Sequence, residues 1–418
     1  MIKKIKVPAS KSYMARALIL ASLRKGKTII KNPLFCEDSN NLINALKNLG
    51  IKFEQKNNSQ ITVHGLGNQL KAPQKTLNIG NSGTAIRFLI PILATQNFTS
   101  TITGNKQMQS RPMHDIIKAL PGIESRNGCP PLTIHGNPNF KPKTIQINGS
   151  ISSQFISGLL MAKKLFGNPK IKITGEIVSK PYIDMTKDII KNFHTPYTIE
   201  TDASSASYFF ALGSVKVLNI NQKSLQADIK MLKYLKKMRY KIIEDREGIQ
   251  TVKPKRLKPL GKVNLIALPD SAMTLATLAC FAEGKSILTG LHNLKFKETN
   301  RLHALKTELS KIGATVRELP NGLEIIGAKR LKPTTIETYN DHRMAMCAAI
   351  LKSRIPGIKI KNPSCVKKTY PNFWNDYSLA TSGQNFSTYY KAPTDLHTIQ
   401  LCSFWQYISL KSDYRGHK

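Results

Sequence analysis

Basic side chains stand inside sequence segments that are otherwise apolar, and they are the first residues that could do chemistry. Lys11 and Arg16 lie five residues apart in KSYMARALIL, and Arg87 interrupts TAIRFLI. Arg343 stands directly before the apolar segment MAMCAAI. A buried charge is costly unless it is paired, so a cation in such a segment usually meets a carboxylate or a phosphate. The pattern predicts anion binding at these positions, with an internal salt bridge as the alternative for each.

Three further motifs carry polar residues that indicate a substrate with several negative charges. They are GNKQMQSRPM with Arg111, VSKPYIDM with Ser179 and Tyr182, and LKFKETNRLHAL with Lys297, Glu298 and Arg301. Cations outnumber carboxylates in these motifs, as the binding of a polyanion requires. Asp270 and Glu298 remain as carboxylates that could transfer protons.

The elements that must position these residues can be read from six similar segments. Each segment begins with small or polar residues and continues as a run of small and apolar ones. They start at residues 10, 81, 152, 202, 270 and 341, so the intervals between them are 71, 71, 50, 68 and 71 residues. This spacing predicts one supersecondary unit used six times, with about 20 residues, the size of a hairpin, missing before the fourth segment. Coincidence is the alternative.

Strands and a second kind of helix are predicted between these segments. Short β-branched runs such as QITVHG and KIKITG close on glycine, as strands often do, and EDSNNLINALKNLGI has the periodicity of an amphipathic helix. The six apolar helices would be buried, and their polar starts would leave backbone N–H groups free for an anion. Ordinary N-capping by serine, asparagine or aspartate explains the same starts without a ligand.

Size and composition agree with a two-domain enzyme. At 418 residues the chain exceeds what one hydrophobic core usually supports, and 41% of its residues are apolar. No apolar run approaches the ~18 residues that a membrane span needs. Because the start MIKKIKVPAS lacks the apolar part of a signal peptide, we expect a cytoplasmic protein with no membrane partner.

Six cysteines without CxxC pairs predict neither a metal site nor a disulfide framework.

The net charge of +38 makes nucleic-acid binding an alternative function. Two observations weaken it. The lysines are spread along the whole chain, and no recognised nucleic-acid-binding motif or aromatic stacking motif accompanies them. A basic surface would also attract small anionic substrates, so nucleic acid is not the partner that we expect.

Taken together, the motifs resemble those of the enolpyruvyl transferases, and within them the 5-enolpyruvylshikimate-3-phosphate synthase family. The strings SKSxxxxR, GNSGTAxR, RP, SSQ, SKPYID, DASSASY, LPDSAMT, KETNRL, DHRMAM and KTYPNF occur in the family's order between about Val7 and Trp374. Chance does not explain ten motifs that all occur in the order found in the family.

The resemblance implies a two-domain, inside-out α/β fold of six βαβαββ-type repeats, three per domain. One domain should comprise residues 9–200, and the other residues 1–8 and 201–378, so that the chain crosses between them near Pro8 and Thr201. Residues 379–418 resemble nothing in the family and are expected to form a disordered tail. The family pattern also implies a monomer that needs no metal and no organic cofactor.

The resemblance also implies roles for individual residues. Shikimate 3-phosphate is expected to meet Lys11, Ser12, Arg16, Ser152, Ser153, Gln154, Ser179, Tyr182, Asp270 and Lys297. Phosphoenolpyruvate is expected to meet Lys11, Asn81, Gly83, Arg111, Gln154, Arg301, Arg343 and Lys368, with Thr84 and Arg87 supporting the same loop. Asp270 would orient and deprotonate the 5-hydroxyl group, and Glu298, with Lys11 and His342, would deliver a proton to the methylene carbon.

The sequence departs from the family pattern at three places, and one related enzyme is a close alternative to the assigned family. The strand that opens the second domain should be shortened or absent, the 50-residue interval should weaken the first domain, and Asn300 replaces a common acidic residue beside Arg301. The rival is the cell-wall enolpyruvyl transferase that acts on a UDP-sugar. It carries a cysteine in the loop that corresponds to residues 104–111, and this chain has none there.

Overall fold

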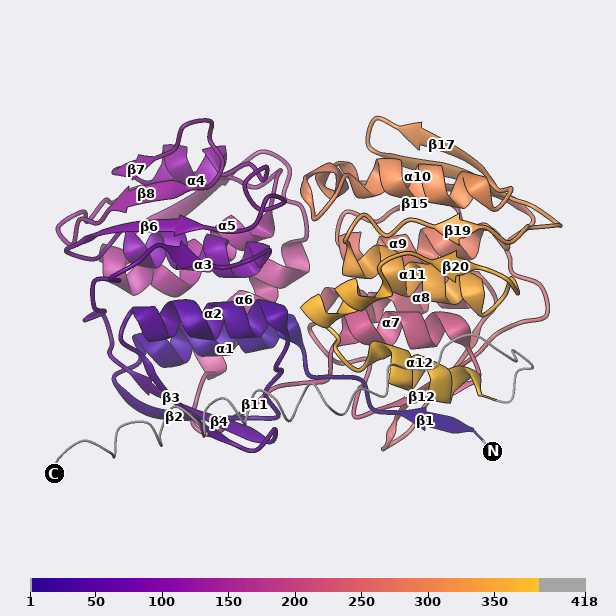
Figure 1. Ribbon diagram of the computed structural model, residues 1–418, viewed down its shortest axis with the longest axis horizontal. Coiled ribbons are helices and arrows are strands. Elements are labelled where there is room, and N and C mark those ends of the chain that lie inside the picture. Colours follow the sequence, from indigo (N-terminus) through magenta and orange to yellow (C-terminus); the bar gives the residue numbers. More distant parts are fainter. Residues whose placement is uncertain (1, 383–418) are drawn as a thin grey trace, which may run out of the picture. The chain divides into compact units, whose positions relative to one another are not determined.

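The computed structural model describes residues 2–382 (Figure 1). Residues 1–381 cluster into one compact unit. Of the predicted tail, residues 379–381 complete helix α12, Phe373–Thr381, and residues 383–418 lie outside the described part of the chain. The expectation of a disordered tail therefore stays a prediction.

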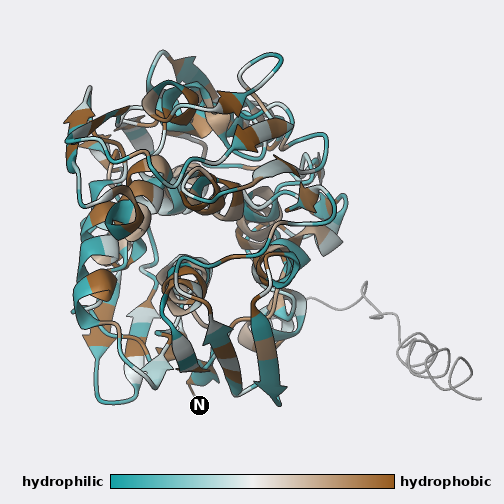
Figure 2. Cartoon of the chain, turned by 90° about the vertical axis from the view of Figure 1, so that its left-hand side faces the viewer, coloured by the Kyte–Doolittle hydropathy of each residue, from teal (hydrophilic) through white to brown (hydrophobic). Residues whose placement is uncertain are grey.

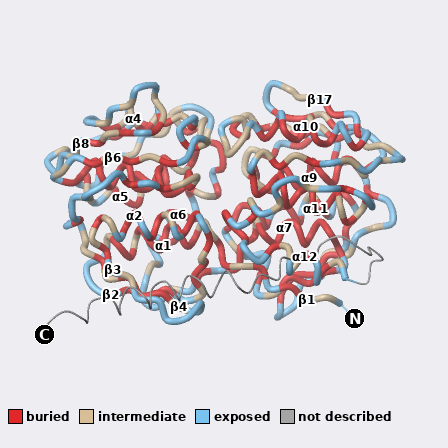
Figure 3. The backbone as a smooth tube through the Cα atoms, in the orientation of Figure 1, coloured by how far each residue is buried: buried red, intermediate tan, exposed pale blue. Residues whose placement is uncertain are grey.

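All six predicted apolar helices are present. They are α1 Lys11–Leu23, α3 Gly83–Leu93, α5 Ser153–Ala162, α7 Ala203–Leu212, α9 Pro269–Ala279 and α11 His342–Lys352. Each begins within two residues of its predicted start, and α9 and α11 are among those drawn as buried in Figure 3. Side-chain N-caps are present at Ser10, Ser152, Asp202 and Asp341, so ordinary capping is correct for four of the six starts.

Residues 9–200, here called the first lobe, contain three sheets. The first has the order β11-β2-β4-β3, with β11 Tyr197–Thr198, β2 Gly26–Lys31, β4 Gln60–Gly65 and β3 Lys52–Lys56. The second has the order β5-β6-β8-β7, with β5 Leu77–Asn78, β6 Thr99–Thr103, β8 Leu132–His135 and β7 Ile123–Glu124. The third pairs β9 Thr144–Asn148 with β10 Lys170–Thr174. The connecting helices are α2 Glu37–Asn48, α4 His114–Ala119, η1 Lys163–Phe166 and α6 Lys180–Asn192.

Residues 2–8 and 201–381, here called the second lobe, repeat this plan. One sheet has the order β1-β12-β14-β13, with β1 Lys3–Ile5, β12 Val215–Leu218, β14 Gly248–Val252 and β13 Lys241–Glu244. The next has the order β15-β16-β18-β17, with β15 Gly261–Asn264, β16 Gly284–Thr289, β18 Gly322–Gly327 and β17 Thr315–Leu319. The last pairs β19 Thr335–Ile336 with β20 Lys359–Ile360. The remaining helices are η2 Ala227–Lys230, α8 Met231–Lys237, η3 His292–Phe296, α10 Arg301–Lys311 and η4 Pro363–Lys368.

The short 50-residue interval follows from this plan. The last unit of each lobe has a two-stranded sheet without the antiparallel hairpin of the other units. After the shortened unit of the first lobe, β11 returns to pair in parallel with β2, and β1 pairs in parallel with β12 in the same way. The opening strand of the second lobe is therefore short but present, and the shortened unit recurs in both lobes of the fold.

The two chain crossings lie side by side. Ala9 and Thr201 form an antiparallel bridge, the Ser10 amide donates to the carbonyl of Glu200 at 2.7 Å, and the Asp202 amide donates to the carbonyl of Pro8 at 2.9 Å. Each lobe has its own cluster of buried apolar residues, one drawn from residues 9–199 and the other from 5–7 and 203–380. These two cores support the proposed division into domains at 9–200 and at 1–8 plus 201–378.

Figure 2 shows the apolar residues along the helices and strands of the chain. Within residues 2–382, no helix combines the length and the apolar character that crossing a bilayer would demand.

A glycine at the end of a strand lets three of the units pack their buried helix closely. In the first unit a Cβ at Gly65 would overlap the carbonyl oxygens of Ala21 and Arg24 at the end of α1. Gly136 and Gly327 meet carbonyl oxygens at the ends of α3 and α9 in the same way. The last strand of these units therefore passes so close to the buried helix that no side chain fits between them.

We predict that Gly65→Ala destabilises the protein by about 3 kcal/mol, because overpacking against rigid backbone forces the strand away from α1. Thermal and urea unfolding of the purified variant measure the change. Gly26→Ala is the matched control, since Gly26 pairs with Gly65 across β2 and β4 and a Cβ there meets nothing within 4 Å. Its positive φ of 96° should cost about 1 kcal/mol. Equal losses in both variants would contradict the packing argument.

Candidate active site

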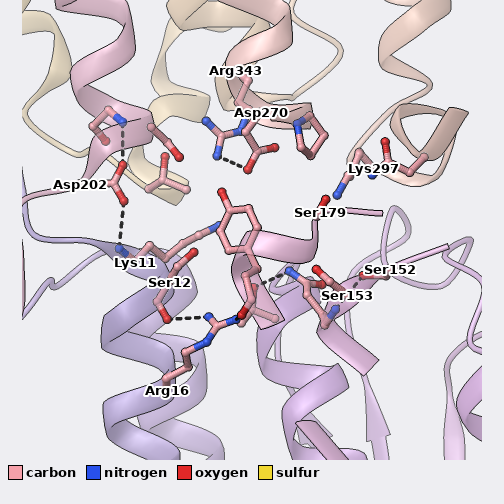
Figure 4. Close-up of a pocket in the computed structure, with 18 of the residues that line it drawn as sticks. Lys11, Ser12, Arg16, Ser152, Ser153, Ser179, Asp202, Asp270, Lys297 and Arg343 are labelled. Atoms are coloured by element: carbon pink, nitrogen blue, oxygen red, sulfur yellow. Dashed lines mark hydrogen bonds and ion pairs between the residues drawn. The ribbon is translucent and has the colours of Figure 1, made fainter. Parts of the chain in front are cut away.

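A cavity of about 740 Å³, including its open mouth, is lined by residues from both lobes (Figure 4). The lining contains every residue predicted to meet shikimate 3-phosphate, namely Lys11, Ser12, Arg16, Ser152, Ser153, Gln154, Ser179, Tyr182, Asp270 and Lys297. Of the residues predicted to meet phosphoenolpyruvate, Lys11, Gln154 and Arg343 line this cavity, whereas Asn81, Gly83, Arg111, Arg301 and Lys368 are not among the lining residues.

A continuous chain of ion pairs joins the two predicted proton-transfer groups. Asp270 contacts Arg343 at 2.8 Å and Arg301 at 3.1 Å. Arg301 in turn contacts Glu298 at 2.8 Å. Glu298 also lies 3.1 Å from Arg111 of the first lobe and 3.3 Å from Lys368. Residues that lie up to 257 positions apart in the sequence therefore meet in one network that crosses between the lobes.

The surrounding cations keep both carboxylates ionised. Burial opposes ionisation of Glu298, but Arg301, Arg111 and Lys368 outweigh it and hold its pKa well below the usual range. Burial likewise opposes ionisation of Asp270, and Arg343 with the neighbouring cations lowers the pKa of that carboxyl. Without a bound anion, these carboxylates are the counter-ions of the site.

Asp38 is a third counter-ion, and the sequence interpretation missed it. Its carboxylate is 3% exposed and contacts Nζ of Lys11 at 2.9 Å and Nζ of Lys368 at 2.7 Å. Burial opposes its ionisation, but the two lysines outweigh this and lower the pKa of Asp38. Asp38 lies in the first turn of α2, where the sequence indicated only an amphipathic helix.

Arg16 and Arg87 are buried without a carboxylate partner among the described residues. Arg16 donates to the hydroxyl of Thr186 at 2.8 Å and to the carbonyls of Ser12 and Tyr182 at 2.8 and 3.1 Å, and burial lowers its pKa to about 10. Arg87 donates to Oε1 of Gln154 at 2.9 Å, and burial together with Arg111 lowers its pKa to about 9.

The internal salt bridge is therefore wrong as an explanation for these two arginines. It is correct for Lys11, which meets Asp38, and for Arg343, which meets Asp270.

Two further titratable groups face the site with shifted pKa values. Burial lowers the pKa of the Lys297 ammonium to about 8, although Asp270 opposes this. His342 is 1% exposed, and neither ring nitrogen has a hydrogen-bond partner. Burial and the nearby cations hold its pKa well below the usual range, so the imidazole is neutral.

The cavity also contains polar groups that the motifs did not single out. Both amide atoms of Asn293 are without a partner although the residue is 1% exposed and lines the cavity. Asp202 lines it too, and accepts from the backbone amide of Lys11 at 3.3 Å (Figure 4). An unpaired buried amide is costly, which suggests that Asn293 binds a ligand. It lies in η3, just before the recognised KETNRL string, so only its position next to that motif could have indicated it.

The loop before α3 brings Gly83 against two guanidinium groups. A Cβ at Gly83 would overlap Arg111 and would lie 2.9 Å from Nη1 of Arg87. Nearby, Thr84 accepts a hydrogen bond from Nε2 of Gln154 at 2.9 Å. A smaller cavity that shares Lys11 and Thr84 with the main one extends toward Asp38. Gly83 and Arg111, both predicted to meet phosphoenolpyruvate, therefore contact each other beside the smaller cavity that Lys11 lines.

Asn300 does not contact Arg301 through an ion pair as an acidic residue could. Its side chain accepts from the His303 amide at 3.3 Å and caps α10. Arg301 is supported by Asp341, whose carboxylate accepts from Nε at 2.7 Å, as well as by Asp270 and Glu298. The departure at Asn300 leaves this arginine fully paired.

Comparison with known proteins gives one consistent family. The family model for EPSP synthase (3-phosphoshikimate 1-carboxyvinyltransferase) matches residues 1–196 and 192–377. The 3-phosphoshikimate 1-carboxyvinyltransferase of Tolumonas auensis is 38% identical over 409 residues, covering 90% of this chain and 95% of its own. The enzyme of the same description from Buchnera aphidicola subsp. Acyrthosiphon pisum is 37% identical over 412 residues, with 89% and 94% covered.

Solved structures resemble the chain over most of its length. The EPSP synthase from Acinetobacter baumannii is 25% identical with a TM-score of 0.70, covering 91% of this chain and 96% of its own. The enolpyruvyl transferase NikO from Streptomyces tendae shares the fold, with a TM-score of 0.68 at 12% identity and coverage of 90% and 94%.

We predict that Asp38→Asn destabilises the ligand-free protein by about 3–5 kcal/mol, because the buried Lys368 and the half-buried Lys11 lose their shared counter-ion. Inorganic phosphate should raise the melting temperature of this variant more than that of the wild type, since the anion replaces the missing charge. Thermal unfolding with and without phosphate measures both effects. Asp184→Asn, which breaks an exposed pair with Lys180, is the control and should melt as the wild type does. A normal melting temperature for Asp38→Asn would contradict the counter-ion role.

Proposed function

The chain belongs to the EPSP synthase family, and from this premise we propose which residues carry out the family's reaction. The protein is an enolpyruvyl transferase of aromatic amino-acid biosynthesis. In the proposed reaction it transfers the enolpyruvyl group of phosphoenolpyruvate to the 5-hydroxyl of shikimate 3-phosphate and releases phosphate. The observation that carries the assignment of residues is the ion-pair network that brings Lys11, Arg111, Asp270, Glu298 and Arg343 together beside one cavity.

Shikimate 3-phosphate occupies the main cavity in this proposal. The hydroxyls of Ser152, Ser153 and Ser179 supply hydrogen bonds for its phosphate, and Lys297 supplies charge. Arg16 and Tyr182 line the same space, and the free amide of Asn293 supplies a donor and an acceptor for the sugar-like ring. The absence of a carboxylate from Arg16 supports this placement, because that guanidinium retains its attraction for an anion.

Phosphoenolpyruvate lies on the side of the site that faces Gly83. Its carboxylate and phosphate take over the cations that now contact Asp38 and Glu298, which include Lys11, Arg111 and Lys368. Arginine suits this task because its planar fork matches both anions. Gly83 leaves the space that the ligand needs beside Arg111.

The chemistry is an addition followed by an elimination. Glu298, with Lys11 and the neutral His342 nearby, delivers a proton to the methylene carbon, which makes the enol carbon electrophilic. Asp270 orients the 5-hydroxyl and receives its proton as the oxygen attacks, giving a tetrahedral ketal phosphate. The new methyl group then returns a proton to Glu298, and the phosphate leaves and takes up the proton held by Asp270, so the enolpyruvyl double bond is restored. Positioning two polyanions in a closed site supplies much of the rate.

Other predictions about the protein's context remain open to test. We propose that it acts as a monomer in the cytoplasm without a metal or organic cofactor. Within residues 2–382, no group of histidine, cysteine, aspartate and glutamate residues is arranged to hold a metal ion. Phosphate release with shikimate 3-phosphate as acceptor, but not with a UDP-sugar, is the experiment that tests the assignment of substrate. Release with the UDP-sugar alone would overturn it.

We predict that Asp270→Ala and Glu298→Gln each lower kcat by about 10²–10⁴-fold, because each removes a proton-transfer group. Substrate binding should largely survive, since most of the predicted ligands remain. A coupled assay of phosphate release gives kcat, and isothermal titration gives the affinities. Glu324→Gln is the control, because this carboxylate lies on β18 and pairs with Lys285 and Arg317 at the surface. Turnover near that of the wild type in both variants would refute the roles assigned to Asp270 and Glu298.

We predict that Gly83→Ala raises the KM for phosphoenolpyruvate by about tenfold or more, because the new methyl group displaces the Arg111 guanidinium. The KM for shikimate 3-phosphate should change little, since its predicted ligands do not touch this Cβ. Initial-rate kinetics with each substrate varied in turn separate the two constants. Equal effects on both would place Gly83 outside the phosphoenolpyruvate side of the site.

A further inference from the structure

The side-chain amide of Gln107 uses its donors and its acceptor in contacts that join the two lobes. Gln107 lies in the loop of residues 104–111, between β6 and α4. Its Nε2 donates to the carbonyls of Glu298 and Tyr339, at 3.1 Å each. Its Oε1 accepts from the amides of Asn81 at 2.8 Å and Asn340 at 3.3 Å. An amide with two donor hydrogens and two acceptor lone pairs is thereby fully engaged.

These partners lie on three separate loops that carry the residues of the site. Asn81 precedes α3 in the first lobe, next to Gly83. Glu298 lies just before α10, and Tyr339 lies just before α11, both in the second lobe. The neighbouring Arg111 adds a parallel contact, because its Nε donates to the carbonyl of Lys297 at 3.3 Å. One loop of the first lobe therefore contacts two successive carbonyls at the base of the Glu298 side chain.

The segment that Gln107 contacts before α11 has a strained backbone. Tyr339 and Asn340 both have φ near 53°, in the left-handed region, which asparagine tolerates but which costs a residue such as Tyr339 roughly 1–2 kcal/mol. Such a turn persists only where its surroundings hold it. Within the second lobe the Tyr339 hydroxyl donates to Glu308 at 2.7 Å, and Oδ1 of Asn340 accepts from Asn362 at 3.0 Å. Gln107 adds two contacts from the other lobe.

The strained turn leads directly into the residues that build the network. Asp341 follows Asn340, caps α11 by accepting from the amide of Arg343 at 2.9 Å, and binds Nε of Arg301 at 2.7 Å. His342 and Arg343 are the first two residues of the helix. A shift of the turn would therefore move the start of α11 and the support of Arg301 together.

We propose that Gln107 is a positioning residue that couples contact between the lobes to the alignment of Glu298 and of the start of α11. It acts through the backbone of other residues and does not touch the substrate. When the lobes separate, both donor contacts and the contact with Asn340 are lost, and the strained turn loses its support from the first lobe. When they meet, the side-chain amide of Gln107 fixes the loop that carries Asn81, the backbone at Glu298, and the turn of Tyr339 and Asn340. This inference rests on the proposed function for its kinetic consequences but not for its structural ones.

Gln107→Met is the first test, because methionine has a similar length and no hydrogen-bonding amide. We expect kcat/KM for phosphoenolpyruvate to fall by at least about tenfold, because methionine makes none of the four neutral hydrogen bonds of the Gln107 amide. The KM for shikimate 3-phosphate should stay within about twofold, because most of its predicted ligands come from the first lobe. Gln109→Met is the matched control, since Gln109 lies in the same loop, is exposed, and its side chain bonds only to the carbonyl of Gly104, at 3.0 Å, among the described residues.

Gln107→Glu gives a pH profile that a purely structural role would not produce. When ionised, the glutamate places a carboxylate against two carbonyl oxygens and close to Glu298, and it donates nothing. When protonated, it recovers one donor. The ratio of variant to wild-type kcat/KM should therefore rise as the pH is lowered, while the ratio for Gln109→Glu stays flat. A flat ratio for Gln107→Glu, or wild-type kinetics for Gln107→Met in an active enzyme, would overturn the proposal.

Amide hydrogen exchange tests the same inference without any substrate. In Gln107→Met we expect exchange in residues 338–343 to become about tenfold faster than in the wild type and in Gln109→Met, because the turn loses its support. Unchanged exchange in this segment would overturn the proposal whatever the activity. If the wild type releases no phosphate but the segment exchanges faster in the variant, the substrate assignment fails and the positioning role stands.

Discussion

Five cations of the site depend on carboxylates from both lobes, and much of the structure is arranged around that requirement; they are Lys11, Arg111, Arg301, Arg343 and Lys368. Removing a charge from water is costly, and it is tolerated here because Asp38, Asp270 and Glu298 each contact at least two cations. Asp38 joins Lys11 of the first lobe to Lys368 of the second, and Glu298 joins Arg301 to Arg111 of the first lobe. The same contacts that neutralise the site also hold the lobes together around it.

The six repeated helices make this convergence possible. Each is apolar on nearly every face, so it must be buried inside its lobe, and each starts with polar residues that cannot be buried without partners. Residues at the starts of all six helices line the cavity, with Thr84 as the contribution of α3 (Figure 4). The strands β1 and β11 lie at the edges of their sheets and pair in parallel with β12 and β2, just before the chain crosses between the lobes at Ala9 and Thr201.

The helices and most of the cavity could be predicted from the sequence because the information is local. Polar starts and apolar bodies locate each helix to within two residues, and short motifs located the residues predicted for shikimate 3-phosphate. Asp38, Asn293 and Gln107 could not be found in this way. Asp38 and Lys368 are 330 residues apart, and Gln107 and Tyr339 are 232 apart, so their importance arises only when distant segments meet. The 50-residue interval was similarly ambiguous until the pairing of β11 with β2 explained it.

The counter-ions of the site also explain how one carboxylate can change its protonation during a reaction. In the protein without a bound anion, Arg301, Arg111 and Lys368 outweigh burial and keep the pKa of Glu298 low, so it holds no proton to give. A bound polyanion that draws Arg111 and Lys368 toward itself adds negative charge beside Glu298 and removes part of that stabilisation. The desolvation that remains then favours the protonated form. In the proposed mechanism Asp270 keeps its contacts with Arg343 and Arg301 and stays ionised, so the same ligand would separate the two carboxyls into a proton donor and a proton acceptor.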